Sequence, residues 1–259
     1  MLIGAYTLAG AATSRSVYLE ELTTAEVRDD VRAGKTTIII PVGGTEQNGP
    51  HMTLGKHNVR VRALAGKIAE ALGDTLVAPV VSYGPEGSVS PPSGHMKFAG
   101  TISIPEAAFS SLLEGAARSF RQHGFTHIVL IGDHGGYRSQ LRAVADRLNK
   151  EWIKSPIRVH HVGEYYAASQ QQYQQALKTK GFTQAQLGEH AGLSDTSLML
   201  ATDAAQVRME RLADAARGGA AAGVSGDPQQ STAALGQVGV DLIVAQTVQA
   251  IRRARESHN

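Results

Sequence analysis

The sequence contains no cysteine, few aromatic residues and no excess of one charge. Without cysteine, disulfide bonds and thiolate metal ligands are excluded, so any metal ion has to be bound by His, Asp or Glu, a set that suits Zn²⁺ or Mn²⁺. The chain has 25 Lys and Arg residues against 23 Asp and Glu residues, spread along its length, and only 5% aromatic residues. This composition is not that of a nucleic-acid-binding protein.

The sequence also lacks a Pro- or Ser-rich linker that would divide it. At 259 residues, with 42% hydrophobic and 19% charged residues, it is long enough for one large domain that buries most of its apolar surface. We therefore predict a single soluble domain over residues 17–259.

Residues 1–16, MLIGAYTLAGAATSRS, allow two interpretations. An apolar stretch that ends in small residues is typical of a signal peptide, but no basic residue precedes Arg15, and the segment is too short and too rich in glycine to span a bilayer. It is a signal-peptide remnant in the first interpretation and a plain N-terminal arm in the second. The sequence therefore leaves a periplasmic or exported location and a cytoplasmic one equally open, and it predicts no membrane segment.

Apolar runs and helical patterns alternate along the chain. Between the runs, apolar residues recur at helical spacing over 61–72, 109–120 and 141–148, and Gly73 and Gly124 stand at the expected helix ends. The runs themselves, rich in β-branched residues, predict strands over residues 36–42, 75–81, 127–131 and 157–162. Such alternation predicts an α/β fold, a three-layer αβα arrangement with a mainly parallel sheet.

Two polar loops follow predicted strands. The segment PVGGTEQNGPHMTLGKHNVR (41–60) contains Glu46, Asn48, His51 and His57, and GDHGGYRSQ (132–140) contains His134. Because the carboxyl ends of parallel strands meet at one edge of the sheet, we expect both loops to lie there, where ligand sites form. This arrangement favours a shared metal site over two independently decorated loops.

A third polar cluster, GEHAGLSDTSLML (188–200), precedes an apolar helical run. Glu189 and His190 are a candidate base and acid, since adjacent residues on an irregular turn can reach one small ligand. Asp195 is placed like a helix N-cap, which is its alternative to a role in the site.

Taken together, these stretches resemble the creatininase family of metal-dependent amidohydrolases. The resemblance spans nearly the whole chain, and five segments carry it in the family's order: GGTEQNGPH, GHMKFAGTISI, GDHGG, HAGLSDTSLML and GVSGDPQQST. It implies the αβα fold, a small-molecule substrate and a homohexamer built as a trimer of dimers.

The resemblance also implies two adjacent divalent ions bridged by an aspartate, and here the sequence departs from the family. The bridging position is His57, and two ligand positions of the second ion are Asn48 and Gly136. What remains is Glu46, His57 and His134, so we predict one ion per chain, Zn²⁺ with Mn²⁺ as the alternative. Asp195 is a possible fourth ligand if it is not a cap.

The remaining residues of these motifs stay ambiguous. His51 and His95 lie in family motifs without matching a ligand position, so either could orient a ligand or line the substrate pocket. Asn48 belongs to this group, and Asp133 and Tyr137 replace the family's Gly and Asn, which changes the expected pocket. Histidines 123, 127, 160, 161 and 258 are interpreted as core or surface residues.

The predicted reaction is hydrolysis of a small, cyclic amide by metal-activated water. Glu189 would take or relay the proton, and His190 would donate one to the leaving nitrogen or stabilise the tetrahedral intermediate. The family also acts on formamides, on peptides and on carbon–carbon bonds of cyclic ketones, and an inactive metal-binding or ligand-binding member is the alternative from another class.

Overall fold

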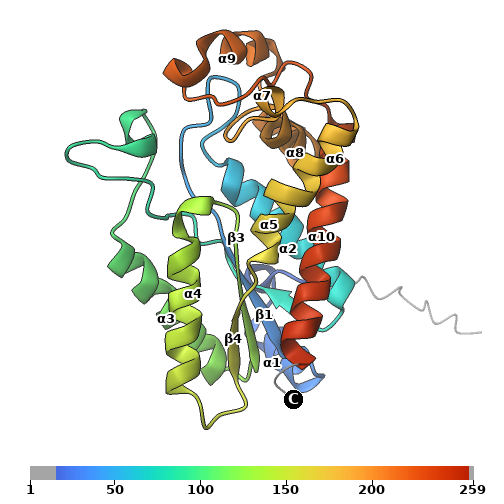
Figure 1. The fold of residues 1–259 in the computed structure, drawn as a ribbon. Coiled ribbons are helices and arrows are strands. Elements are labelled where there is room, and N and C mark those ends of the chain that lie inside the picture. The colour runs from blue at the N-terminus through green and yellow to red at the C-terminus, as the bar shows by residue number, and fades with distance from the viewer. Residues whose placement is uncertain (1–15, 257–259) are drawn as a thin grey trace, which may run out of the picture.

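The structure, a computed structural model, describes residues 16–256 (Figure 1). The prediction for the N-terminal arm therefore lies outside the described residues except for Ser16. The strands are β1 (Thr37–Val42), β2 (Thr75–Val77), β3 (His127–Gly132) and β4 (Arg158–His161). The helices are α1 (Thr24–Arg32), α2 (Lys56–Leu72), α3 (Glu106–Gln122), α4 (Arg138–Glu151), α5 (Glu164–Ala167), α6 (Tyr173–Thr179), α7 (Gln184–Leu187), α8 (Leu193–Asp203), α9 (Leu212–Gly218) and α10 (Ala233–Glu256).

The four strands of the described residues form one parallel sheet, as the sequence predicts, and their order is β2-β1-β3-β4. β2 is shorter than the predicted run over residues 75–81. Ala78 and Val81 still donate to the β1 carbonyls of Ile39 and Pro41, but Pro79 between them has no N–H to donate.

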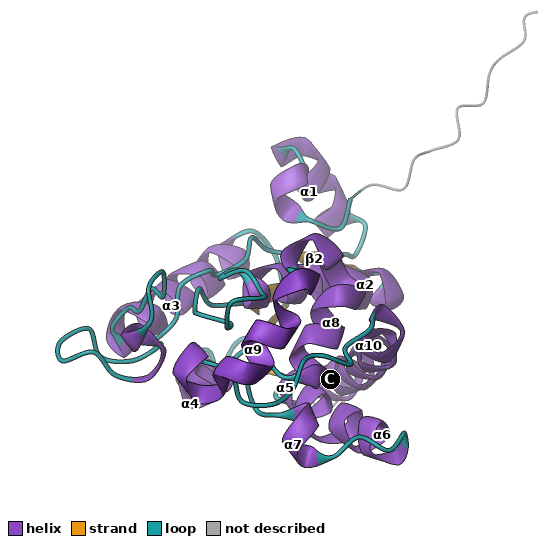
Figure 2. Ribbon diagram, turned by 90° about the horizontal axis from the view of Figure 1, so that it is seen from above, coloured by secondary structure: helices purple, strands orange, loops and turns teal. Residues whose placement is uncertain are grey.

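Helices cover both faces of the sheet, which confirms the three-layer prediction (Figures 1 and 2). Successive residues of β1 point to opposite faces, so Ile38 and Ile40 pack in one core cluster and Ile39 in the other. The first cluster includes residues of α3 and α4, and the second includes residues of α2, α8 and α10.

α8 and α10 pack closely at a glycine. A Cβ built on Gly236 of α10 would lie 1.8 Å from the carbonyl oxygen of Ser197 in α8, so only glycine permits this approach. By length and composition α10 could cross a membrane, but its residues Val240, Ile243 and Ile251 are buried in the core against other helices.

The parallel register sets the position of the polar loops. Val42 pairs with Gly132, so β1 and β3 end side by side, and the loop after β1, drawn in blue in Figure 1, leaves the sheet beside residues 133–137. Thr53 and His51 of this loop exchange backbone hydrogen bonds with Gln206 and Arg208, which join it to the segment after α8. Both polar loops therefore share one sheet edge, as predicted.

Candidate metal centre

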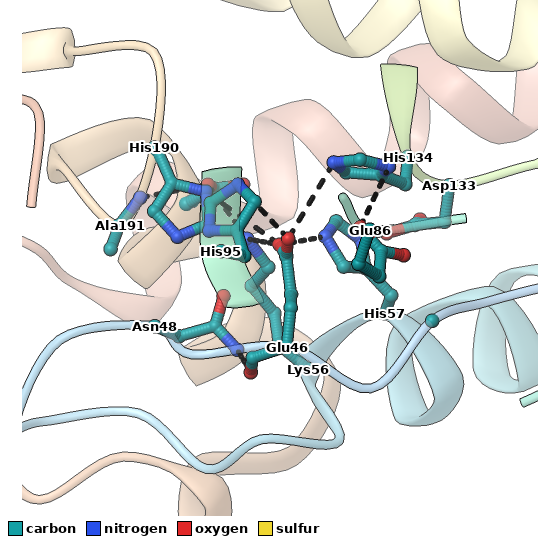
Figure 3. A network of polar contacts seen from close by, with 12 residues as sticks. Glu46, Asn48, Lys56, His57, Glu86, His95, Asp133, His134, His190 and Ala191 are labelled. Atoms are coloured by element: carbon teal, nitrogen blue, oxygen red, sulfur yellow. Dashed lines mark hydrogen bonds and ion pairs between the residues drawn. The ribbon is translucent and has the colours of Figure 1, made fainter. Parts of the chain in front are cut away.

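Glu46 lies at the centre of the polar cluster at this edge (Figure 3). Its side chain is 0% exposed, and its Oε2 atom has no hydrogen-bond partner among the described residues. Two imidazole nitrogens face this oxygen, His95 Nε2 at 3.2 Å and His134 Nε2 at 3.5 Å. A buried carboxylate oxygen without a donor is costly unless a cation completes its surroundings.

Glu46, His95 and His134 offer ligand atoms that all lie within 4.8 Å of one another. Neighbouring ligand atoms around a tetrahedral zinc ion, with bonds of about 2.0–2.1 Å, are separated by about 3.3 Å. The two contacts of Glu46 Oε2 bracket that separation, so the three side chains fit a divalent ion.

The other oxygen of Glu46 faces cations of the chain itself. His57 Nε2 lies 2.7 Å and Lys56 Nζ 3.6 Å from Oε1, and both side chains come from the first turn of α2. The structure thus places His57 next to Glu46 and beside His134, with ring centroids 5.2 Å apart, but His57 contacts a different carboxylate oxygen from the one that His95 and His134 face.

His57 and Lys56 belong to a closed ring of alternating charges. Arg60, one helical turn after Lys56, completes the set of three cations from α2, and Glu46, Asp133 and Asp195 are the acids. The remaining contacts of this charge ring are His57–Asp133 at 2.5 Å, Arg60–Asp133 at 2.6 Å, Arg60–Asp195 at 2.8 Å and Lys56–Asp195 at 3.1 Å. The acids come from the loop after β1, the end of β3 and α8, so the ring ties three elements to one helix.

The ring governs the ionisation of its acids. Burial alone would raise the pKa of Glu46, but His57 and Lys56 hold it well below its usual range. Asp195 behaves in the same way, since burial is outweighed by Lys56 and Arg60, which lower its pKa. Burial and Lys56 oppose a charged His57, yet Glu46 and Asp133 raise its pKa. These directions describe three carboxylates matched by three cations.

Three imidazoles near Glu46 but outside the ring favour the neutral form. Burial lowers the pKa of His134 to about 4 and that of His190 to about 3, and it also lowers the pKa of His95. Neutral imidazole is the form that binds a metal ion or accepts a proton.

Gln47 joins two of these imidazoles to a distant loop. Its amide nitrogen donates to the carbonyl of Gly223 and lies 3.0 Å from His95 Nδ1. His190 Nε2 donates to the backbone carbonyl of Gln47 at 2.9 Å, which leaves Nδ1 of His190 as the bare nitrogen, 3.6 Å from Glu46.

Other residues singled out in the sequence have different positions. Asp195 lies in the first turn of α8, whose N-cap position is Gly192 without a side-chain cap bond, and it accepts from Ala191 N besides its two ion pairs. Glu189 is exposed, and its carboxylate makes no hydrogen bond or ion pair with residues 16–256. The amide of Asn48 donates to the Glu46 and Thr53 carbonyls and so shapes the loop.

His51 and Tyr137 are fully buried. His51 Nε2 lies 2.9 Å from Thr196 Oγ1 and connects the loop to α8. The Tyr137 hydroxyl lies 2.8 Å from the Val42 carbonyl and accepts from His134 N, so it braces the turn that carries His134.

Sequence reasoning missed Lys56, Arg60, Gln47 and Glu86. A signal existed for the first two, because positions 56, 57 and 60 of a helix that begins after Gly55 lie close together at its first turn. Glu86 lies in a long irregular segment after the second strand. No periodic pattern in this segment predicts which way its side chain points. Glu86 is 4% exposed, its Oε2 lies 3.4 Å from His134 Nδ1, and burial with the nearby Glu46 raises its pKa to about 7.

Comparison with known proteins points to one family. The family model described as creatinine amidohydrolase matches residues 20–251. Creatinine amidohydrolase of Pseudomonas putida is 30% identical over 206 residues, which cover 78% of this chain and 77% of that protein. The mycofactocin precursor peptide peptidase of Mycobacterium tuberculosis is 30% identical over 229 residues, with 78% of each chain covered.

Solved structures agree with the sequence comparison. A crystal structure of creatinine amidohydrolase superposes with a TM-score of 0.77 and 27% identity, covering 93% of this chain and 98% of the other. A manganese form of creatininase gives a TM-score of 0.76 at 27% identity, covering 93% and 99%. A creatininase variant described as a Zn-Zn type gives 0.76 at 26% identity, with the same coverage.

Proposed function

The chain belongs to the creatininase family of metal-dependent amidohydrolases, and from this premise we propose that it hydrolyses the C–N bond of a small, cyclic amide with one divalent ion per chain. In this proposal Glu46, His95 and His134 hold the ion. For His95 this requires the Gln47 amide, whose nitrogen lies 3.0 Å from His95 Nδ1, to turn its oxygen toward that atom. The observation that carries it is the Oε2 atom of Glu46, a buried oxygen without a hydrogen-bond partner that two imidazole nitrogens face.

One carboxylate and two imidazoles are a donor set that suits Zn²⁺, with Mn²⁺ as the alternative. When bound, such an ion lowers the pKa of a bound water toward about 7 and polarises the substrate carbonyl. The predicted ligand His57 remains the alternative third ligand. In the structure His57 contacts Oε1 of Glu46, and in this proposal that contact fixes the carboxylate and leaves Oε2 for the ion.

Proton transfer falls to His190 and Glu189. Burial keeps His190 neutral, and its bare Nδ1 faces Glu46, so it can take a proton and donate it to the leaving nitrogen. Glu189 neighbours His190 in the chain and is exposed, so it can relay that proton to solvent. The contact of His190 Nε2 with the Gln47 carbonyl fixes the ring orientation for this role.

The substrate class follows from the family together with the departures in this chain. Relatives are named for different substrates, creatinine, a precursor peptide and, in Thermotoga maritima, 3-dehydro-scyllo-inosose, the last at 30% identity over 46% of this chain and 36% of that protein. Asn48, His57 and Gly136 depart from the creatininase ligand pattern, so creatinine itself is not the proposed substrate. Formamides, peptides and cyclic ketones are the alternatives.

A substrate screen with two variants tests the proposal. Ion-loaded protein is assayed with small lactams, other cyclic amides, formamides, short peptides and cyclic ketones. Glu189→Gln and His190→Gln are expected to keep the ion and to lower kcat by about 10²–10⁴-fold. Cleavage of peptides or ketones alone would show that a small cyclic amide is not the substrate. If the ion-loaded protein turns over no compound in the panel, the alternative of an inactive binding protein is favoured.

The same premise supports a homohexamer in solution, which light scattering tests. Closed symmetric assemblies are common among soluble enzymes. A monomer at micromolar concentration would contradict this part of the proposal.

A further inference from the structure

Glu86 is a buried acid that the proposed reaction does not use. It lies between β2 and α3, is 4% exposed, and neither of its carboxylate oxygens has a hydrogen-bond partner among residues 16–256. Two polar groups of the site lie near it: the His134 imidazole, whose Nδ1 atom is 3.4 Å from Glu86 Oε2, and the Glu46 carboxyl. A buried carboxyl without a donor destabilises a fold, so Glu86 is expected to lower the stability of the ion-free protein.

Two glycines make room for this carboxylate. A Cβ on Gly44 would lie 2.7 Å from Glu86 Oε1, and a Cβ on Gly84 would lie 3.3 Å from the same atom. The backbone of the loop after β1 and that of the Glu86 loop thus both approach the carboxylate closely. Figure 3 shows Glu86 beside His134, with the contact to Nδ1 marked.

We propose that Glu86 is the positioning residue for His134: its carboxylate accepts the proton of Nδ1, so that Nε2 presents a lone pair to the ion. This inference rests on the proposed function, in which His134 is a ligand. A neutral imidazole carries one proton, and a nitrogen that binds a metal ion must be bare, so the other nitrogen needs an acceptor.

His134 has a competing arrangement. The backbone N–H of Gly136 donates to His134 Nδ1 at 3.2 Å, which requires a lone pair on Nδ1 and puts the proton on Nε2. Nε2 would then direct a proton at Glu46 Oε2, 3.5 Å away, and could not bind an ion. Glu86 supplies the acceptor that reverses this arrangement.

Two measurements on one variant, its metal affinity and its denaturant midpoint, separate a positioning role from a structural role. In Glu86→Gln, the affinity for Zn²⁺ and Co²⁺, measured by competition with a chromophoric chelator, should fall about 10–100-fold. The ion-free variant should unfold at the same or a higher denaturant concentration than the wild type, because the unpaired buried carboxyl is gone. A structural role would instead lower the denaturant midpoint.

Glu114 supplies a control carboxylate away from the site. It lies on α3, and its Oε1 atom pairs with Arg147 Nη1 at 2.7 Å. Glu114→Gln should leave metal affinity unchanged. Glu86→Leu offers no acceptor at all and should weaken metal binding further than Glu86→Gln does. It also serves as the second variant if Glu86→Gln does not fold.

The outcomes also separate this inference from the proposed function. If the wild type binds the ion, His134→Gln loses it and both Glu86 variants bind it as tightly as the wild type, the positioning role is overturned and the metal proposal stands. If the wild type binds no divalent ion, both are overturned.

Discussion

His57 and Glu46 form a buried contact of 2.7 Å between Nε2 and Oε1, and neither side chain is more than 4% exposed. This contact assigns different tasks to the two oxygens of Glu46. Oε1 faces His57 and Lys56, and Oε2 faces His95 and His134. A carboxylate fixed in this way can bind an ion through one oxygen without having to reorient.

The first prediction concerns the third ligand. His95→Gln should weaken metal binding by more than the ~10–100-fold that loss of an outer-shell partner costs, because it removes a ligand atom. His57→Gln keeps a hydrogen-bond donor beside Glu46 and should reduce affinity by less than that. Both affinities are measured by competition with a chelator. The reverse order would make His57 the ligand, as the sequence predicts.

The second prediction concerns the charge ring. Arg60→Met removes the cation shared by Asp133 and Asp195, and breaking a buried pair in this way should lower the free energy of unfolding by about 3–5 kcal/mol. Arg28→Met is the control, since Arg28 and Asp29 are both more than half exposed and such pairs contribute at most about 1 kcal/mol. Urea unfolding of ion-free protein measures both. Equal effects would show that the ring has no special importance for stability.

The sequence predicts the sheet and its layers because they follow from periodicity. The β-branched runs of β1 and β3 are long and end at glycines, so the shared sheet edge of the two loops can be inferred from residue order alone. The length of β2 is the exception. Pro79 has no backbone N–H to donate, and an apolar pattern does not predict where that missing donor ends the strand.

The site is predictable only in part. Glu46 and His134 follow directly from strands that the sequence identifies, so their proximity can be inferred. His95 and Glu86 come from the irregular segment between β2 and α3, where residue spacing does not predict which way a side chain points. Motif spacing also places His57 near Glu46, but it does not show which nitrogen faces which oxygen, and that detail decides whether an imidazole pairs with the acid or binds the ion.

The third prediction concerns pH. Burial lowers the pKa of His51 to about 4 from 6.5 in the unfolded chain. Between these values the unfolded state binds a proton that the folded state does not, so stability falls as the pH drops through this window and levels off below it. His51→Gln should lack this pH-dependent contribution to the free energy of unfolding. The difference in stability between the wild type and the variant should therefore shrink from pH 7.5 to pH 4.5. Parallel curves in urea unfolding would contradict the depressed pKa.

The fourth prediction concerns the contact between α8 and α10. Gly236→Ala forces a methyl group against the Ser197 carbonyl and should lower stability by about 1–3 kcal/mol, although alanine favours helix. Gly115→Ala, in α3 with no atom within 4 Å of the added Cβ, should raise stability by about 1 kcal/mol. Chemical denaturation of both variants checks the signs. A stabilising Gly236→Ala would mean that the two helices are further apart.

The metal content of the purified protein tests the central claim most directly. Wild-type protein prepared without chelator should carry about one divalent ion per chain, most of it zinc, since one carboxylate and two imidazoles complete a single site. Glu46→Gln prepared in the same way should carry almost none. Two ions per chain in the wild type, or one retained by Glu46→Gln, would contradict a single metal centre built on Glu46.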